Sequence, residues 1–178
     1  MADKNLKDLF IHTLKDVYYA ETAITKALPK MAKASQSAEL KKAFEKHLKE
    51  TGNQIARLDK VFGHLGMKSS SVPCEAIKGL LKEGEEVMEE FEGSPALDAG
   101  LIAAAQAVEH YEIARYGTLK CWAGELGMDE VVELLSATLD EEKSTDESLT
   151  DLAESSVNAA AEAPADEMSE PKKARKRA

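Results

Sequence analysis

The sequence predicts an all-α protein, a four-helix bundle with a long crossover connection that contains a short fifth helix. Apolar residues recur at helical spacing over four long segments, at about residues 4–33, 37–65, 96–126 and 129–154. The chain has only 10 glycines and 5 prolines among 178 residues, which is few for the many turns of a β sandwich or barrel. One bundle of this size therefore accounts for most of the chain.

The lengths of the connections predict how the helices are joined. The stretches KASQSAEL (residues 33–40) and GELGMDEV (residues 124–131) are short, so each should join an antiparallel pair of helices. The connection over residues 66–95 is much longer: it opens with the loop-forming GMKSSSVPCEA and continues as the amphipathic CEAIKGLLKEGEEVMEEFEG. Such a connection can run the length of a bundle, which would make the second and third long helices parallel.

The chain divides into a bundle and a tail. We assign residues 1–157 to the four-helix bundle and residues 158–178 to a tail rich in Ala, Glu and Pro. The tail has too few large apolar residues to bury a core, so we expect it to be disordered. It ends in a basic cluster: Lys172, Lys173, Arg175, Lys176 and Arg177. We interpret this cluster as a solvated end, with electrostatic contact to an acidic partner as the alternative.

Composition argues against several classes of protein. The net charge of −10 is unlike that of a general nucleic-acid-binding protein, because attraction to phosphates needs a basic surface, which only the tail offers. No run of 18 apolar residues is present, so we expect no membrane-spanning helix. The N-terminal MADKNLKDLF lacks the apolar stretch of a signal peptide, and the two cysteines form no CxxC motif. We therefore expect a cytoplasmic protein with reduced thiols.

Carboxylates lie on or beside the apolar stripe of every predicted long helix. The six acids are, in chain order, Glu21, Glu50, Glu109, Glu112, Glu142 and Asp146. On a helical wheel, Glu21, Glu112 and Glu142 lie at the centres of the stripes in the first, third and fourth segments. The other three lie beside a stripe or one turn further along it. These positions point the carboxylates toward the core of the bundle.

The cost of burying these acids predicts a metal site. An isolated buried carboxylate costs several kcal/mol, and the leucine that it replaces would have contributed roughly 1.5–3 kcal/mol. Four such positions would cancel most of a typical domain stability of about 5–15 kcal/mol. The stripes hold no Lys or Arg near their centres, and Arg115 comes closest at about 60° away. Carboxylates from four facing helices are the ligands of a di-iron or di-manganese bundle, so we predict that all six acids are metal ligands.

The spacing of the acids indicates an internal repeat. Glu21 and Glu50 are 29 positions apart, and Glu112 and Glu142 are 30 positions apart. Each helical hairpin can therefore return its second acid to the level of its first. The stretches HLKETGNQ and TLDEEKSTD also correspond, which aligns Glu50 with Glu142. A repeat of this kind would bracket two metal ions between the two halves.

Two further polar residues, His47 and Gln54, fall within the stripe of the second segment. The signature of a carboxylate bundle is Glu-x-x-His, with the histidine after the glutamate. Here His47 precedes Glu50, and Asn53 occupies the position where a histidine would follow it. We therefore interpret His47 and Gln54 as outer groups that orient the ligands rather than as ligands.

Four motifs carry a resemblance to a known family. They are LFIHTLKDVYYAE (residues 9–21), HLKETGNQIARLD (47–59), LIAAAQAVEHYEIARYGTL (101–119) and LLSATLDEEKSTDESLTDLA (134–153). The chain resembles the bacterial YciE/YciF family of the ferritin-like superfamily over about residues 4–157. This resemblance implies a ferritin-like four-helix bundle with a dinuclear metal centre, a tendency to form a homodimer and a role in the stress response.

A more remote resemblance is to the rubrerythrins. Their third helix carries a Glu-x-x-Glu pair, which Glu109 and Glu112 match here. The sequence departs from them because it lacks histidines three positions after Glu50 and Glu142 and lacks a rubredoxin-like cysteine domain. These differences argue against peroxidase chemistry of the rubrerythrin type.

Together the acids and the resemblance favour a di-iron protein that oxidises Fe(II) with dioxygen or peroxide. Two iron ions are the expected cofactor, with manganese as the alternative metal. Three other functions stay open: a di-manganese catalase-like enzyme, a non-catalytic structural or interaction protein whose metal stabilises the fold, and DNA protection by a ferritin-like shell through the basic tail. The acidic charge of the bundle argues against the last of these. The residues alone leave open whether the protein is an enzyme.

Overall fold

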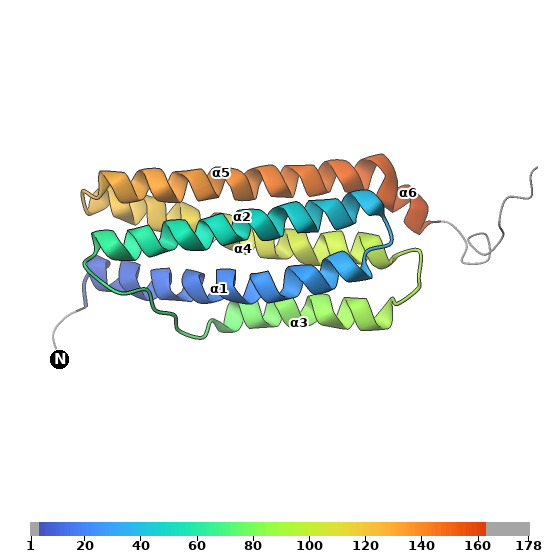
Figure 1. The fold of residues 1–178 in the computed structure, drawn as a ribbon, viewed down its shortest axis with the longest axis horizontal. Helices are drawn as coiled ribbons and strands as arrows, with labels where there is room; N and C mark the ends of the chain where they lie inside the picture. Colours follow the sequence, from blue (N-terminus) through green and yellow to red (C-terminus); the bar gives the residue numbers. More distant parts are fainter. Residues whose placement is uncertain (1–3, 163–178) are drawn as a thin grey trace, which may run out of the picture.

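Residues 4–162 are described by a computed structural model, in which they form a helical bundle (Figure 1). The long helices are α1 (Leu6–Ala34), α2 (Ala38–His64), α4 (Leu97–Glu125) and α5 (Asp129–Leu152), and the shorter α3 (Glu75–Glu90) comes between α2 and α4. No strand occurs among the described residues. The predicted all-α class, with four long helices and a short fifth one, is confirmed.

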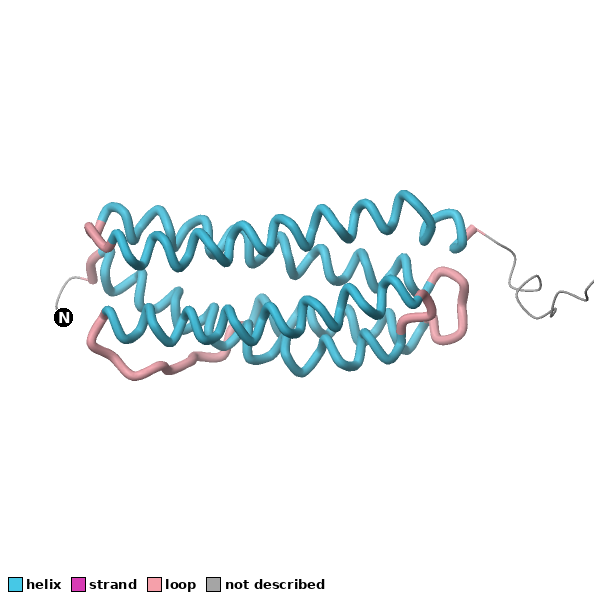
Figure 2. Tube along the Cα trace, turned by 45° about the horizontal axis from the view of Figure 1, so that its top comes forward, coloured by secondary structure: helices cyan, strands magenta, loops and turns pink. Residues whose placement is uncertain are grey.

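The connection between α2 and α4 crosses the length of the bundle, as the sequence predicts. The helices α1 and α2 run antiparallel, as do α4 and α5, whereas α2 and α4 run in the same direction (Figure 1). The helix α3 packs against α1 and α4 on the outside of the bundle, and Figure 2 shows the long loop that leads to it along one side. Because α1 also contacts α4 and α2 contacts α5, the middle turns of the four long helices face one another.

The turn between α1 and α2 is held by a carboxylate from the start of α4. Asp98 is buried and accepts hydrogen bonds from the backbone N–H groups of Gln36, at 2.8 Å, and Ser37, at 2.7 Å. Ser37 in turn caps α2, because its hydroxyl accepts from the backbone N–H groups of Glu39 and Leu40. These contacts fix the first hairpin against the second.

The turn between α4 and α5 depends on Gly127, whose φ of 69° is a conformation that other residues rarely adopt. The N–H of Gly127 donates to the carbonyl of Gly124 at 3.0 Å, and the N–H of Met128 donates to that of Ala123 at 2.9 Å. These bonds satisfy carbonyl groups at the end of α4. The chain therefore reverses within a few residues, and the central acids of α4 and α5 return to the same level.

The apolar core is divided into two clusters. One contains Ile24, Leu28, Leu40, Phe44, Leu101 and Leu149 among others. The other contains Phe10, Leu14, Val17, Leu58, Leu119 and Leu135 among others. On α2, α4 and α5 the predicted site residues come between the members of the two clusters, and on α1 Glu21 follows Ala20, the first member of one cluster after Val17 of the other. The middle of the bundle is therefore a polar layer with apolar packing on both sides.

The last helix continues past the predicted end of the bundle. A π-helical turn, η1 (Ala153–Val157), and the short α6 (Asn158–Ala161) follow α5 without a break, and Val157 is buried. The predicted tail therefore begins in a helix. From residue 163 on, including its basic cluster, the tail lies outside the described residues. Within residues 4–162, no helix is both long and apolar enough to cross a membrane.

Candidate metal centre

Four of the six predicted acids are completely buried in the middle of the bundle. Each has at most 1% of its surface exposed; they are Glu21 on α1, Glu109 and Glu112 on α4, and Glu142 on α5. Each lies on the apolar face of its helix, which packs against the core. The helical rotation that buries the leucines therefore also buries the acids.

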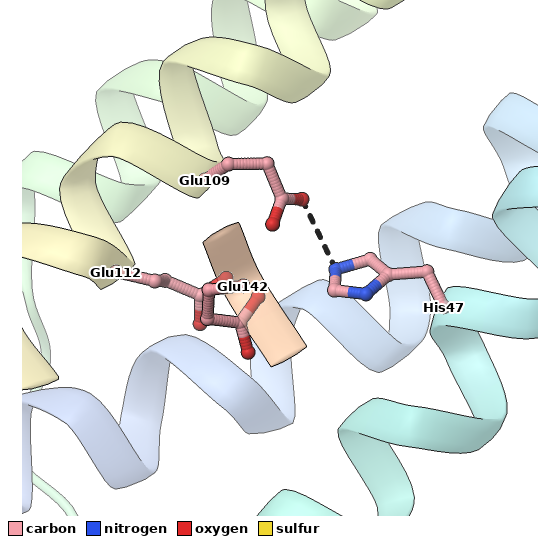
Figure 3. Close-up of side chains that lie close together, drawn as sticks. All are labelled: His47, Glu109, Glu112 and Glu142. Carbon is pink, nitrogen blue, oxygen red and sulfur yellow. Dashed lines mark ion pairs between the residues drawn. The ribbon is translucent and has the colours of Figure 1, made fainter. Parts of the chain in front are cut away.

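Three of these acids and His47 from α2 converge on one point. One ligand atom from each of His47, Glu109, Glu112 and Glu142 lies within 4.8 Å of the others. Figure 3 shows the three carboxylates and the imidazole facing the same small space. Carboxylates and a histidine on facing helices are the kind of side chains that hold metal ions in the core of a bundle.

The structure places His47 closer to the centre than its sequence position indicates. The side chain is 3% exposed, and its Nε2 lies 3.2 Å from Oε1 of Glu109. Neither ring nitrogen of His47 makes a hydrogen bond, so at least one of them is free to bind a cation. The signal was present in the sequence, because His47 falls within the apolar stripe. Its order before Glu50, the reverse of Glu-x-x-His, favoured an outer role.

Glu21 on α1 lies in the same buried layer, close enough to Glu142, His47 and Glu109 for their charges to act on its pKa. Its Oε1 accepts a hydrogen bond from the hydroxyl of Tyr116, which is itself fully buried. Its Oε2 has no hydrogen-bond partner. Tyr116 therefore holds one carboxylate oxygen of Glu21 and leaves the other available.

The remaining two predicted ligands, Glu50 and Asp146, lie at the margin of the buried group. Both side chains are 23% exposed. Glu50 pairs with Lys46, with 3.0 Å between Oε1 and Nζ, while its Oε2 is buried without a partner. Asp146 accepts a hydrogen bond from Gln106 Nε2 at 3.0 Å and lies 3.3 Å from Nε2 of His110. Asp146 thus has partners on its own side of the bundle, whereas Glu50 has a partner for only one of its two carboxylate oxygens.

Burial and mutual repulsion raise the pKa of the central acids. Burial raises the pKa of Glu109 to about 7. Burial, with the neighbouring charge of Glu109, raises that of Glu142 to about 9. The pKa values of Glu112 and Glu21 lie well above the usual range, again because of burial first and nearby carboxylates second. Among the described residues, no lysine or arginine forms a salt bridge with any of these four acids.

The distribution of unsatisfied polar atoms tests whether a metal fits here. Within residues 4–162, ten buried side-chain nitrogen and oxygen atoms have no hydrogen-bond partner. They belong to Glu21, His47, Glu50, Gln54, Glu109, Glu112 and Glu142, all of them predicted site residues. Buried polar groups in folded proteins are nearly always paired, and this concentration includes the four residues whose side chains could hold a metal ion. Carboxylate oxygens with an imidazole nitrogen fit divalent iron or manganese.

An ion pair between Arg57 and Glu141, which the helical wheel does not predict, also contacts Gln54. Arg57 on α2 donates to both carboxylate oxygens of Glu141 on α5, at 2.6 Å and 2.5 Å. The same carboxylate accepts from Gln54 Nε2 at 3.1 Å, and Arg57 also donates to Thr138 at 3.3 Å. This pair joins α2 to α5 beside the centre and orients Gln54. Both residues lie off their stripes, so only the packing of α2 on α5 reveals their contact.

Comparison with known sequences agrees with this arrangement. The family described as "Domain of unknown function (DUF892)" matches residues 5–162. Protein YciF of Escherichia coli K12 is 49% identical over 160 residues, which cover 89% of this chain and 96% of YciF. The sequence match therefore spans the bundle and all the predicted site residues.

Solved structures of two similar proteins share the fold. The crystal structure of the E. coli stress protein YciF superposes with a TM-score of 0.84 at 48% identity and covers 88% of this chain and 99% of that one. YcfI of Rhodopseudomonas palustris, described as a proposed structural protein, superposes with a TM-score of 0.81 at 51% identity and covers 83% and 94%. The chain therefore belongs to the DUF892 family and is a relative of YciF, as the four sequence motifs predicted.

Proposed function

We propose that this protein binds two iron ions in the middle of the bundle and promotes the oxidation of Fe(II) by dioxygen or peroxide. The observation that supports this function most directly is the group of ten unpartnered polar atoms, all in predicted site residues. Burial first, and repulsion between neighbouring carboxylates second, raise the pKa values of the central acids, and bound cations would stabilise their ionised forms. Manganese has similar ligand preferences, so it is the alternative metal.

The residues of the proposed centre divide into two groups. His47, Glu109, Glu112 and Glu142, whose ligand atoms lie closest together, would hold the metal most directly. Glu21 and Glu50, each with one unpartnered buried oxygen, would complete a second position. Bound iron would supply the electrons that reduce dioxygen or peroxide. The chain itself orients the carboxylates and excludes water through the apolar clusters on both sides.

The test compares iron oxidation by wild type and by matched variants. Metal-free protein is loaded with Fe(II) without oxygen and then exposed to dioxygen or to peroxide, and the ferric absorbance is followed. We expect oxidation faster than in buffer alone, and loss of this acceleration in Glu142→Ala. Glu133→Ala, at an exposed position of the same helix, is the control and should behave as wild type. Equal rates in wild type and Glu142→Ala would show that the chemistry is that of free iron.

A non-catalytic, metal-stabilised structural protein is the second candidate. It is favoured by the nearly complete burial of the four central ligands and by the description of YcfI as a proposed structural protein. In that case metal would raise the melting temperature, since it binds the native state, while Fe(II) oxidation would be no faster than in buffer. The two measurements on one preparation therefore separate the candidates.

The resemblance to the YciE/YciF family also supports a homodimer located in the cytoplasm. The chain has a mass of 19.3 kDa, and sedimentation analysis should give twice this value. Metal content of protein isolated from cells grown with both iron and manganese would identify the native metal. Iron in excess over manganese supports the proposed cofactor, whereas manganese alone would favour a catalase-like activity.

A further inference from the structure

A cavity of about 60 Å³ lies between α2 and α5 and reaches the proposed centre. Its inner wall includes the buried side chains of His47 and Glu109, and its outer wall includes Lys46 and Ser148, which are exposed. Ala43 and Leu149 are among the residues between them. The cavity therefore links the surface of the bundle to two of the four central ligands.

Glu50 lies in the wall of this cavity and faces two environments. Its Oε1 lies 3.0 Å from Nζ of Lys46, whose side chain is 63% exposed. Its Oε2 is buried and has no hydrogen-bond partner. One oxygen of Glu50 thus forms an ion pair with Lys46 at the surface, and the other is buried. His47, another residue of the cavity wall, has two ring nitrogens without hydrogen-bond partners.

We propose that this cavity is the route by which a divalent cation reaches the centre, and that Glu50 is its gate. In this role Glu50 releases Lys46, takes the arriving cation and passes it to Glu109 and His47. The inference rests on the proposed metal binding, in which Glu50 would also complete the second metal position, and adds to it a route by which the ion reaches His47 and Glu109.

Three physical features favour a cation and a gate of this kind. A cavity of about 60 Å³ holds only a few water molecules, so a fully hydrated ion must lose water, and the oxygens of Glu50 can replace it. The Lys46–Glu50 pair joins adjacent turns of one helix at the surface, where ion pairs are weak and exchange readily. The donors further inward are the carboxylate of Glu109 and the imidazole of His47, whose oxygen and nitrogen atoms are ligands for divalent cations.

Filling the cavity tests the route without touching a ligand. Co(II) is mixed rapidly with the metal-free full chain, and its visible absorption gives the association and dissociation rates. Ala43→Leu should lower both rates about tenfold and leave the equilibrium dissociation constant unchanged, because it narrows the passage but not the centre. Ala137→Leu, at an exposed position of α5, is the matched control and should leave both rates unchanged.

Removing the two charges in turn tests the gate. Glu50→Gln should slow the association of Co(II) with the site formed by His47, Glu109, Glu112 and Glu142 more than it weakens equilibrium binding there. Lys46→Met should speed this association several-fold. In the double variant the effect of Lys46→Met should vanish, because its partner is already neutral. Lys82→Met, which breaks the exposed Lys82–Glu86 pair on α3, controls for the general loss of one positive charge and should leave the rate unchanged.

The outcomes separate this inference from the proposed function. Native association rates in both Ala43→Leu and Glu50→Gln, with helicity and melting temperature retained, would overturn the route and leave the metal centre intact. Failure of the wild type to bind Co(II), Fe(II) or Mn(II) would instead overturn the proposed function, and the route with it.

Discussion

Tyr116 on α4 donates a hydrogen bond to Glu21 on α1 through a hydroxyl that is completely buried. This contact joins two helices from different hairpins across the proposed metal centre. It also explains how Glu21 tolerates a site without a lysine or arginine partner, because one of its two oxygens is satisfied by a neutral donor. The other oxygen remains free for a cation.

Tyr116→Phe should therefore destabilise the metal-free protein by about 1–3 kcal/mol, the usual cost of leaving a buried polar group without its partner. Urea denaturation followed by circular dichroism measures the change. Tyr18→Phe is the matched control: it removes a hydrogen bond of 3.1 Å to Asp59 at an exposed site and should cost much less. Equal losses in the two variants would contradict the importance of the buried bond.

The stability of the metal-free protein should fall as pH rises through neutrality. An unfolded glutamate has a pKa of about 4.3, whereas the folded pKa is about 7 for Glu109 and about 9 for Glu142. Between these values the folded state binds more protons than the unfolded state. The contribution of each group is therefore complete below about pH 4 and is lost as pH rises through its folded pKa.

Denaturation in urea at intervals between pH 5 and pH 9 tests this dependence. We expect a slope on the order of 1 kcal/mol per pH unit where one group titrates. Glu109→Gln should flatten the lower part of the curve, up to about pH 7. Saturating metal should reverse the trend, because cations bind ionised carboxylates more tightly. Stability that rises with pH in the metal-free protein would contradict the raised pKa values.

Glu112→Leu should separate metal binding from folding. This substitution replaces a buried acid, neither of whose oxygens has a hydrogen bond, with an apolar side chain of similar size. Replacing buried charges with apolar groups is often neutral or stabilising, so the metal-free variant should be at least as stable as wild type. Metal should then raise the melting temperature of wild type but much less that of the variant. Glu125→Leu, at the exposed end of α4, is the control. Unchanged metal affinity in Glu112→Leu would refute its assignment as a ligand.

Asp98 should matter for stability but not for metal binding. Asp98→Ala leaves the backbone N–H groups of Gln36 and Ser37 without their acceptor, which should cost about 2–4 kcal/mol. Asp98→Asn keeps an oxygen that can accept one of these bonds, so its loss should be smaller. Chemical denaturation and titration with Co(II) measure the two properties. A large change in metal affinity would mean that the first hairpin positions the centre through this turn.

Much of the fold follows from the sequence because helical periodicity is a local property. Each long helix shows its stripe in its own residues, and the position of Glu21, Glu112 or Glu142 on that stripe depends only on the 100° rotation per residue. The short turns and the long connection likewise restrict the pairing of helices to few arrangements. This is why the crossover bundle could be predicted without a structure.

The membership of the buried group was decided by the tertiary structure. A helical wheel gives the direction of each side chain around the helix axis. The distance between side chains on different helices depends on the axial offset between the helices and on which other side chains are available as partners. His47 reaches within 3.2 Å of Glu109, although its sequence order indicated an outer role. Asp146, one turn beyond Glu142, instead meets Gln106 and His110.

By itself, then, the sequence determined an all-helical bundle, the faces that its helices bury and the acids that those faces carry. The tertiary structure decided which acids meet, that His47 joins them, and that the Lys46–Glu50 pair lies beside a cavity leading to them. The physical reason is the range of the interactions. Periodicity and burial are set within a few turns of one helix, whereas convergence depends on contacts between residues far apart in the chain, such as Tyr116 and Glu21, which are 95 positions apart.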